Sequence, residues 1–446
     1  MRVGKMHHAY MISSIAVCLL LCFAQVMGSA LLILPCLAMF TMIMCWGAVQ
    51  NKTMPLLLFF IPWSPVLRLS PDTFSFYTLC LMLICIIGVV KKWNHFKRYH
   101  LVAGILLLFL TLLSKLIDGS GLAMDYISFM LLIFLFPVVA YETKEGRYDF
   151  MDVVVYFSAG IILASLCAQE LASYANMAKY IRVDQYHAVT RRCGFYGDPN
   201  FFVAQVTAAL SGCMTLLMKK NTRRNFWLLV ALTMFLCYCG FLSGSKSFAL
   251  VMGLMLLAWL VELVRMRGQA KLKASLLICT VVAIVYVSTS ALFENLINVI
   301  MVRLMSATNL DTFTTGRPEL WASYLKEIFT DVKVLLMGKG FTNVKINARA
   351  SHSTLIQLIF QFGCLGAPIL AGWCYSFFRE HTYMCRWSQV EKMKVIMLVI
   401  GIFVPWLAID GLFFDEFFMW QWFFALGVQA MMREEALPAE SEAAAA

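Results

Sequence analysis

The sequence predicts an all-α polytopic membrane protein with about 14 transmembrane helices and a long, partly helical extracytoplasmic loop. Two observations predict this class. Of the 446 residues, 61% are hydrophobic and only 14% are charged, which is far too apolar for a soluble domain of this length. Apolar runs of about 17–25 residues, the length that crosses a bilayer as a helix, recur from one end of the chain to the other.

The expected membrane spans follow one another with mostly short connections. The first two meet at Gly28–Ser29 and are predicted to form a helical hairpin rather than a cleaved signal peptide. The third is short and contains three prolines, so we expect it to be broken or re-entrant. The predicted spans are 10–28, 29–49, 54–69, 73–90, 99–117, 122–141, 150–171, 199–218, 225–242, 247–264, 274–292, 353–378, 395–409 and 417–432.

These spans and the loops between them divide the chain into six regions. They are the N-terminal transmembrane helices (1–171), an outer loop with an arginine pair (172–198), further transmembrane helices (199–292), a large outer loop (293–352), the C-terminal transmembrane helices (353–432) and a disordered tail (433–446).

Lysine and arginine in the short loops predict the orientation, because such residues are enriched on the cytoplasmic side. With the N-terminus inside, most of the 36 lysines and arginines fall in inner segments, among them "KKWNHFKR" (91–98) and "KKNTRR" (219–224). Both termini are therefore expected on the inner side, and the loops 172–198 and 293–352 on the outer side.

The two outer loops contain recognisable helix signals. Asp198 followed by Pro199 predicts the N-cap and first residue of a helix. "RPELWASYLKEIF" (317–329) predicts an amphipathic helix at the membrane surface, with a stripe made of Leu320, Trp321, Tyr324, Leu325 and Ile328. "MGKGF" (337–341) is expected to form a turn, with too few glycines for a phosphate loop.

Basic side chains of the outer loops gather near places where the chain meets the membrane: Arg191, Arg192, Lys246 and Arg317. Each can be explained by snorkelling of a long side chain to the membrane interface. Together they also suit an anion, because the guanidinium group grips phosphate oxygens through two nitrogens. A lipid pyrophosphate in the outer leaflet is such an anion.

Only two of the seven histidines, His187 and His352, fall on the predicted outer side. His352 directly precedes an apolar helix. Histidine titrates near neutral pH, so His352 could accept a proton from a hydroxyl. The alternative is that it is simply a polar residue at a helix start.

Several classes of site find no support in the sequence. The 15 cysteines are scattered, which excludes an extracellular disulfide framework. Cysteine and histidine show no zinc-ligand spacing, and the outer loops contain no Asp-x-Asp, so neither a metal nor another cofactor is expected. Ionisable residues lie near the ends of the spans rather than at their middle, which argues against an ion-coupled transporter.

Four segments together resemble the O-antigen polymerase and O-antigen ligase superfamily of bacterial multispanning enzymes, which includes the Wzy-type polymerases. They are "RRCGFYGDPNFF" (191–202), "SGSKS" (243–247), "TTGRPELW" (314–321) and a His-Ser pair before the next helix. His352, Ser353, Gly363 and Gly366 follow the ligase pattern of His-Ser, nine residues, Gly, two residues and Gly. The resemblance covers roughly residues 180–380.

This resemblance implies a metal-independent, inverting glycosyltransferase in the bacterial cytoplasmic (inner) membrane, with its active site on the extracytoplasmic side. The donor would be an undecaprenyl-pyrophosphate-linked oligosaccharide. By the resemblance His352 would activate the acceptor hydroxyl, and Arg191 or Arg192 with Arg317 would contact the pyrophosphate. Lys246 stands where relatives often have arginine. The candidate catalytic residues are His352, Arg192 and Arg317, and the candidate substrate-binding residues are Arg191, Lys246, Arg349 and Asp198.

Three functions stay open at this point. The preferred one is a polymerase that joins lipid-linked repeat units into a surface polysaccharide such as O-antigen, capsule or exopolysaccharide. The second is a ligase that moves the finished glycan to another acceptor, and the third is a flippase or transporter of lipid-linked oligosaccharide. The expected partners are the lipid-linked donor, membrane lipid and a chain-length regulator protein, and no nucleic acid.

Overall fold

The computed structural model describes the chain apart from residues 1–7, 94–96, 120–127, 129–130, 146, 182–183, 187–188, 220, 267–269, 306–315, 341–344, 347–348, 382–394, 412–415 and 444–446. The described part is almost entirely helical and contains one short β-hairpin. Nine of its helices are long and apolar enough to cross a membrane. The protein is therefore an all-α, multi-pass membrane protein, while the count of about 14 spans stays a prediction.

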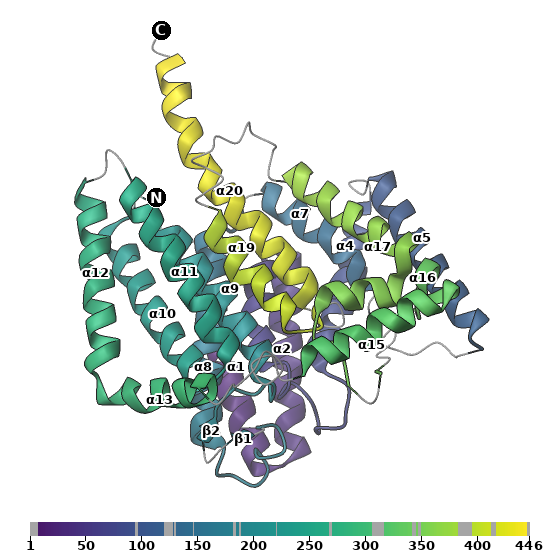
Figure 1. Ribbon diagram of the computed structural model, residues 1–446, viewed down its shortest axis with the longest axis horizontal. Helices are drawn as coiled ribbons and strands as arrows, with labels where there is room; N and C mark the ends of the chain where they lie inside the picture. The colour runs from purple at the N-terminus through teal and green to yellow at the C-terminus, as the bar shows by residue number, and fades with distance from the viewer. Residues whose placement is uncertain are drawn as a thin grey trace.

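Each of the nine long apolar helices coincides with a predicted span (Figure 1). They are α1 (His8–Met27), α2 (Ala30–Val49), α5 (Arg98–Ile117), α8 (Phe150–Leu171), α9 (Pro199–Leu217), α10 (Arg223–Leu242), α11 (Lys246–Arg265), α12 (Ala270–Thr289) and α17 (Thr354–His381).

The five other predicted spans coincide with helices that are shorter or less apolar. They are α3 (Thr53–Phe60) with the 3-10 turn η1 (Ile61–Trp63), α4 (Phe76–Lys92), α7 (Leu135–Glu145), α19 (Ile396–Phe403) with η3 (Val404–Leu407), and α20 (Glu416–Ala443). Most of the first half of the expected span 122–141 lies outside the described residues.

The segment 54–69 is broken, as its prolines predict. Helix α3 ends at Phe60, and Pro62 lies in the 3-10 turn that follows. Every residue of α3 is buried, so this helix packs inside the bundle. Gly160 of α8 permits the close contact, because a Cβ at this position would lie 2.2 Å from the carbonyl oxygen of Phe59.

Helix α9 is the most enclosed of the nine long helices. In its most apolar stretch 89% of the residues are buried, against 6% for α12 at the edge of the bundle. Small residues let neighbouring backbones approach α9. Thr207 donates a hydrogen bond of 2.8 Å to the carbonyl oxygen of Gly401 in α19, and a Cβ at Gly401 would lie 2.5 Å from Cβ of Ser211. The residues at the start of α9 are thereby fixed relative to the C-terminal helices.

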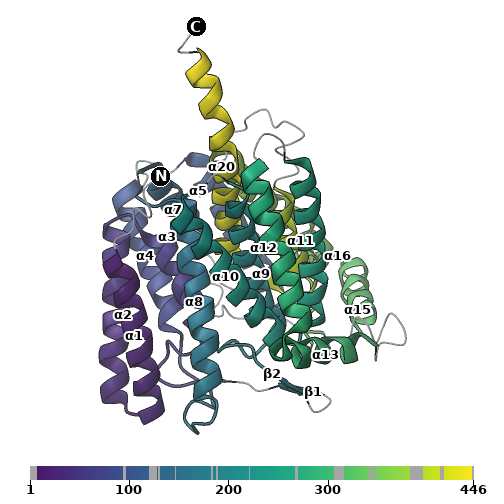
Figure 2. The ribbon, with the colours of Figure 1, turned by 90° about the vertical axis from the view of Figure 1, so that its left-hand side faces the viewer.

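The two ends of the bundle differ (Figure 2). Both chain termini lie at one end. The hairpin of β1 (Asp184–Tyr186) and β2 (Val189–Arg191) and the helix α13 (Ala291–Met305) lie at the opposite end. This second end is called the loop end below. The hairpin of the loop 172–198 and the beginning of the loop 293–352 thus share an end, and the assignment of that end to the outer side stays a prediction from the basic residues.

Helix α17 is interrupted at Gly363, which has φ 61° and ψ −174°. The turn after α16 (Val332–Met337) fills the break. The N–H of Lys339 donates to the carbonyl oxygen of Phe360 at 2.9 Å, and the N–H of Gly340 donates to that of Gln361 at 3.1 Å. The described part of the predicted turn, residues 337–340, therefore supplies partners for carbonyl groups that the break leaves without their helical donors.

The amphipathic helix predicted at 317–329 is α15 (Arg317–Thr330). Its apolar stripe packs differently from the expectation. Leu320, Tyr324 and Ile328 are buried against Val334 and Phe360, which belong to α16 and α17. The central residues of the stripe are therefore covered by protein, and the position of the helix at the membrane surface stays a prediction.

The tail of the chain also differs from the expectation. The predicted disordered tail 433–446 is helical as far as Ala443, because α20 continues through it. Its alanine and glutamate residues favour the helix. Cys193, in the predicted outer loop 172–198, is buried, with 2% of its surface exposed.

Candidate functional site

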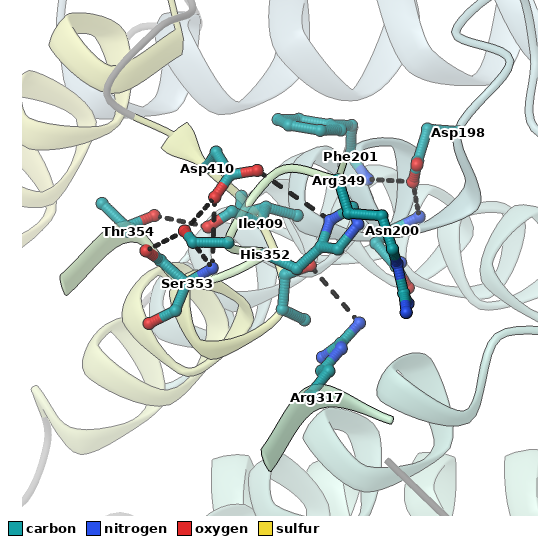
Figure 3. A network of polar contacts seen from close by, with 12 residues as sticks. Asp198, Asn200, Phe201, Arg317, Arg349, His352, Ser353, Thr354, Ile409 and Asp410 are labelled. Carbon is teal, nitrogen blue, oxygen red and sulfur yellow. Dashed lines mark hydrogen bonds and ion pairs between the residues drawn. The ribbon is translucent and has the colours of Figure 1, made fainter. Parts of the chain in front are cut away.

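The start of α9 lies at the loop end of the bundle, where the candidate residues gather. Asp198 caps α9, as predicted: its carboxylate accepts hydrogen bonds from the N–H groups of Asn200 at 2.7 Å and Phe201 at 3.4 Å (Figure 3). The cap leaves the side chain of Asn200 to bind a neighbouring turn. The sequence therefore fixes both the helix start and its contacts.

The turn "SGSKS" (243–247) lies against Asn200. The hydroxyl groups of Ser245 and Ser247 each donate to Oδ1 of Asn200 at 3.3 Å. Lys246 lies between these serines as the first residue of α11, and it is half-buried. Two motifs separated by about 45 residues are thus joined, although Asn200 was not among the predicted site residues.

The arginine pair divides into one buried and one exposed member. Arg191 is 7% exposed, and its Nε donates to the carbonyl oxygen of Ser243 at 3.0 Å. The backbone N–H of Arg192 donates to the carbonyl oxygen of Leu242 at 3.0 Å, and the Arg192 residue itself is exposed. Arg191 therefore anchors β2 to the turn before α11, whereas Arg192 is accessible at the loop end.

Arg317 opens α15 and reaches the end of η3. Its guanidinium nitrogens lie 3.4 Å from the carbonyl oxygen of Leu407 and 3.5 Å from that of Ala408. Burial lowers the pKa of Arg317 from its ordinary value, while the carboxylates of Asp198 and Asp410 oppose this shift. Arg317 therefore lies within electrostatic reach of both acidic residues.

Arg349 comes close to Arg317 through the loop that precedes α17. The hydroxyl of Tyr324 donates to the carbonyl oxygen of Arg349 at 2.8 Å, and Nε1 of Trp321 donates to that of Ser351 at 2.9 Å. These bonds tie the loop to α15. A Cβ at Gly316 would lie 4.0 Å from an Nη atom of Arg349, so this guanidinium group lies beside the residue that precedes Arg317.

His352 is held in an uncommon backbone conformation by its surroundings. Its φ is 50°, in the left-handed region that residues other than glycine seldom occupy. The flanking residues bind one carboxylate oxygen: the hydroxyl of Ser351 donates to Oδ1 of Asp410 at 2.7 Å, and the N–H of Ser353 donates to it at 3.2 Å. The hydrogen bonds to Asp410 thus hold the backbone of His352 in this strained conformation.

The other carboxylate oxygen of Asp410 faces the imidazole. Nδ1 of His352 lies 3.9 Å from Oδ2 of Asp410 (Figure 3). The His352 side chain is 33% exposed and that of Asp410 is 7% exposed. Burial raises the pKa of Asp410, while the hydrogen bond from Ser351 and a positive charge on His352 oppose the shift. The pair therefore has one buried member and one accessible member.

The segments around His352 and Asp410 are bonded to each other beyond the pair itself. Oγ1 of Thr354 donates to the carbonyl oxygen of Ile409 at 2.8 Å, and the N–H of Gly411 donates to Oγ1 of Thr354 at 3.0 Å. The start of α17 and residues 409–411 thus form one hydrogen-bonded support for the imidazole.

The structure brings four of the seven predicted site residues into one cluster: His352, Arg317, Arg349 and Asp198. Figure 3 shows that the side chains of Arg317, Arg349 and His352 lie together. Arg191, Arg192 and Lys246 belong to the same end and reach the cluster indirectly, through the turn 243–247 and Asn200. His187, the other predicted outer histidine, lies outside the described residues.

Sequence reasoning missed Asp410, Ser351 and Asn200. A signal for Asp410 does exist, because it interrupts the apolar run "WLAIDGLFF" (406–414) at a predicted outer turn. Its pairing with His352, 58 positions earlier, is a feature of the fold. In the described part of the chain, no group of three or more His, Cys, Asp or Glu side chains is placed to hold a metal ion.

Chemically, the cluster combines positive charge with an accessible imidazole. Two guanidinium groups favour binding of an anion such as a phosphate. The imidazole, oriented by a buried carboxylate, is suited to accept a proton. Comparison with known protein families, with curated proteins and with solved structures finds no match for this chain.

Proposed function

We propose that the protein is a membrane glycosyltransferase that joins undecaprenyl-pyrophosphate-linked oligosaccharide repeat units into a surface polysaccharide. The observation that carries the proposal is the placement of the His352–Asp410 pair beside Arg317 and Arg349 at the loop end of the bundle. A transfer of this kind needs groups that bind the leaving pyrophosphate and a base that deprotonates the acceptor hydroxyl. The cluster contains side chains of both kinds.

In the proposed reaction, an acceptor sugar hydroxyl attacks the anomeric carbon of the donor on the side opposite the pyrophosphate. The new carbon–oxygen bond forms as the bond to pyrophosphate breaks, and the electron pair leaves with the pyrophosphate. The hydroxyl proton passes to Nε2 of His352, since Nδ1 faces Asp410. Because the acceptor attacks opposite the leaving group, the anomeric centre is inverted.

The arginines would stabilise the negative charge that grows on the leaving group. We assign this role to Arg317 and Arg349 in the cluster and to Arg192 as the exposed member of the pair. Arg191 is reassigned to a structural role, because its Nε is bonded to Ser243. Asp198 likewise acts on the fold, by capping α9.

A ligase that passes the finished glycan to a different acceptor is the second candidate. The specific observation in its favour is the sequence pattern from His352 to Gly366. Gly363 of this pattern already has a structural task, because it breaks α17 where the turn after α16 packs. We therefore keep polymerase as the preferred activity.

Analysis of the products separates these activities. Purified protein is given a lipid-linked repeat unit alone, and the glycans are resolved by size. A ladder of lengths is expected for the polymerase. Absence of product until a second acceptor is added would favour the ligase, and absence of transfer to every acceptor in folded protein would reject the glycosyltransferase proposal.

A further inference from the structure

A cavity of about 930 Å³ lies at the end of the bundle that carries both termini, far from the cluster around His352. The beginning of α1 and the end of α2 form most of its wall, together with Lys52 and Arg147. Trp46, with 59% of its surface exposed, is one of the apolar residues at its rim, so the cavity opens on the surface of the bundle.

Lys52 is fixed in this cavity by the way in which α2 ends. Asn51 has φ 57°, in the left-handed conformation that terminates helices. The N–H of Lys52 donates to the carbonyl oxygen of Gly47 at 2.8 Å, and that of Asn51 donates to the oxygen of Ala48 at 3.3 Å. These two bonds form a Schellman motif. Lys52 is consequently 8% exposed and points back along the helix pair.

The lining of the cavity is amphipathic. Nζ of Lys52 lies 5.3 Å from the centre of the Tyr10 ring, and Arg147 adds a second cation that is exposed. Burial lowers the pKa of Lys52, Asp152 opposes this shift and Arg147 adds to it. Asp152 is not among the lining residues, which include two cations and no acidic side chain. The rest of the lining is apolar apart from small or amide groups.

We infer that this cavity binds an anionic phospholipid of the leaflet at the termini end, with its phosphate against Lys52 and Arg147. Basic pockets between membrane helices suit anionic lipid headgroups. Tryptophan and tyrosine are enriched at the level of the headgroups, where Trp46 and Tyr10 stand at helix ends. The apolar wall between α1 and α2 provides a surface for the acyl chains.

This lipid site is separate from the proposed glycan transfer, because the two sites lie at opposite ends of the bundle. Its test therefore uses no glycan donor. Delipidated, purified protein is titrated with phosphatidylglycerol or phosphatidylcholine, and the lipid-bound species are counted by native mass spectrometry. One phosphatidylglycerol should bind more tightly than phosphatidylcholine.

Two variants probe the cations separately, and a third is the control. Lys52→Gln and Arg147→Gln should each weaken phosphatidylglycerol binding about fivefold, as expected for one basic residue near a headgroup. Arg147 is exposed, so its variant should fold even if Lys52→Gln does not. Lys91→Gln removes an exposed lysine near the end of α4, outside the cavity, and should leave binding unchanged.

Three results would overturn the inference. The first is equal binding of phosphatidylglycerol and phosphatidylcholine, and the second is native affinity in Arg147→Gln. The third is displacement of phosphatidylglycerol by an equal concentration of undecaprenyl phosphate, which would assign the cavity to the polyprenyl carrier.

Discussion

Replacing Asp410 by asparagine should remove most of the transfer activity and leave the fold intact. The amide oxygen of asparagine can keep the position of Oδ1, which accepts from Ser351 at 2.7 Å and from Ser353 at 3.2 Å. The amide nitrogen then replaces Oδ2 and faces Nδ1 of His352. Because that nitrogen donates a proton, Nδ1 must accept it, and the imidazole proton moves to Nε2, where a base is required.

The expected loss of transfer rate follows from these contacts. A general base contributes about 10²–10⁴-fold to a rate. A His352 imidazole with its proton on Nε2 cannot accept the acceptor's proton there, so a large part of this factor is lost. Stability should change little, because the two retained hydrogen bonds are those that contribute to folding, each about 0.5–1.5 kcal/mol. Asp410→Asn should therefore lower the rate of transfer about 10²-fold or more, with thermal unfolding near that of the native protein.

The assay compares single-turnover transfer from a lipid-linked repeat unit with thermal unfolding of the same preparations. Asp331→Asn is the matched control, because Asp331 caps α16 through the N–H groups of Lys333 and Val334 and asparagine caps helices as well. Native transfer by folded Asp410→Asn protein would refute the role of the carboxylate in orienting His352.

Further substitutions test the three arginines and the break in α17. Arg317→Lys keeps the charge and loses the planar fork, so kcat/KM should fall about 10–100-fold, and an unchanged value would remove Arg317 from the pyrophosphate site. Arg191→Gln should lower the free energy of unfolding by about 1.5–3 kcal/mol, because it loses the bond to Ser243. Arg192→Gln should lower kcat/KM and leave thermal unfolding normal. The reverse pattern would exchange the roles of the two arginines. Gly363→Ala should destabilise the protein by at least about 1–2 kcal/mol, because φ is 61° and the new Cβ would lie 2.4 Å from the carbonyl oxygen of Leu336. Gly372→Ala is the control. It lies in open space on the same helix and should be neutral or slightly stabilising.

The helices were largely predictable, because a membrane helix is encoded in consecutive residues. The apolar run of α1 and the Asp198–Pro199 start of α9 are local signals, and both are found where the sequence places them. The break in α17 was harder to predict from the sequence. Gly363 alone does not predict a helix break, because its conformation depends on the turn after α16 that packs against it.

The candidate site was predictable in part for the same reason. Residue type and position near a helix start singled out His352 and Arg317. The distinction between Arg191 and Arg192 could not be predicted, because it depends on how the fold packs the end of β2 against the turn before α11. Asp410 was missed because its contact with His352 joins segments that are far apart in the chain.

The central claim is that His352 is the base of a glycan transfer whose donor is held by other residues. The most direct test measures turnover of a lipid-linked repeat unit by native and His352→Ala protein, at equal folded amounts and saturating donor. We predict that the variant is slower by about 10²–10⁴-fold while donor binding stays nearly native. Equal turnover by the two proteins would contradict the account.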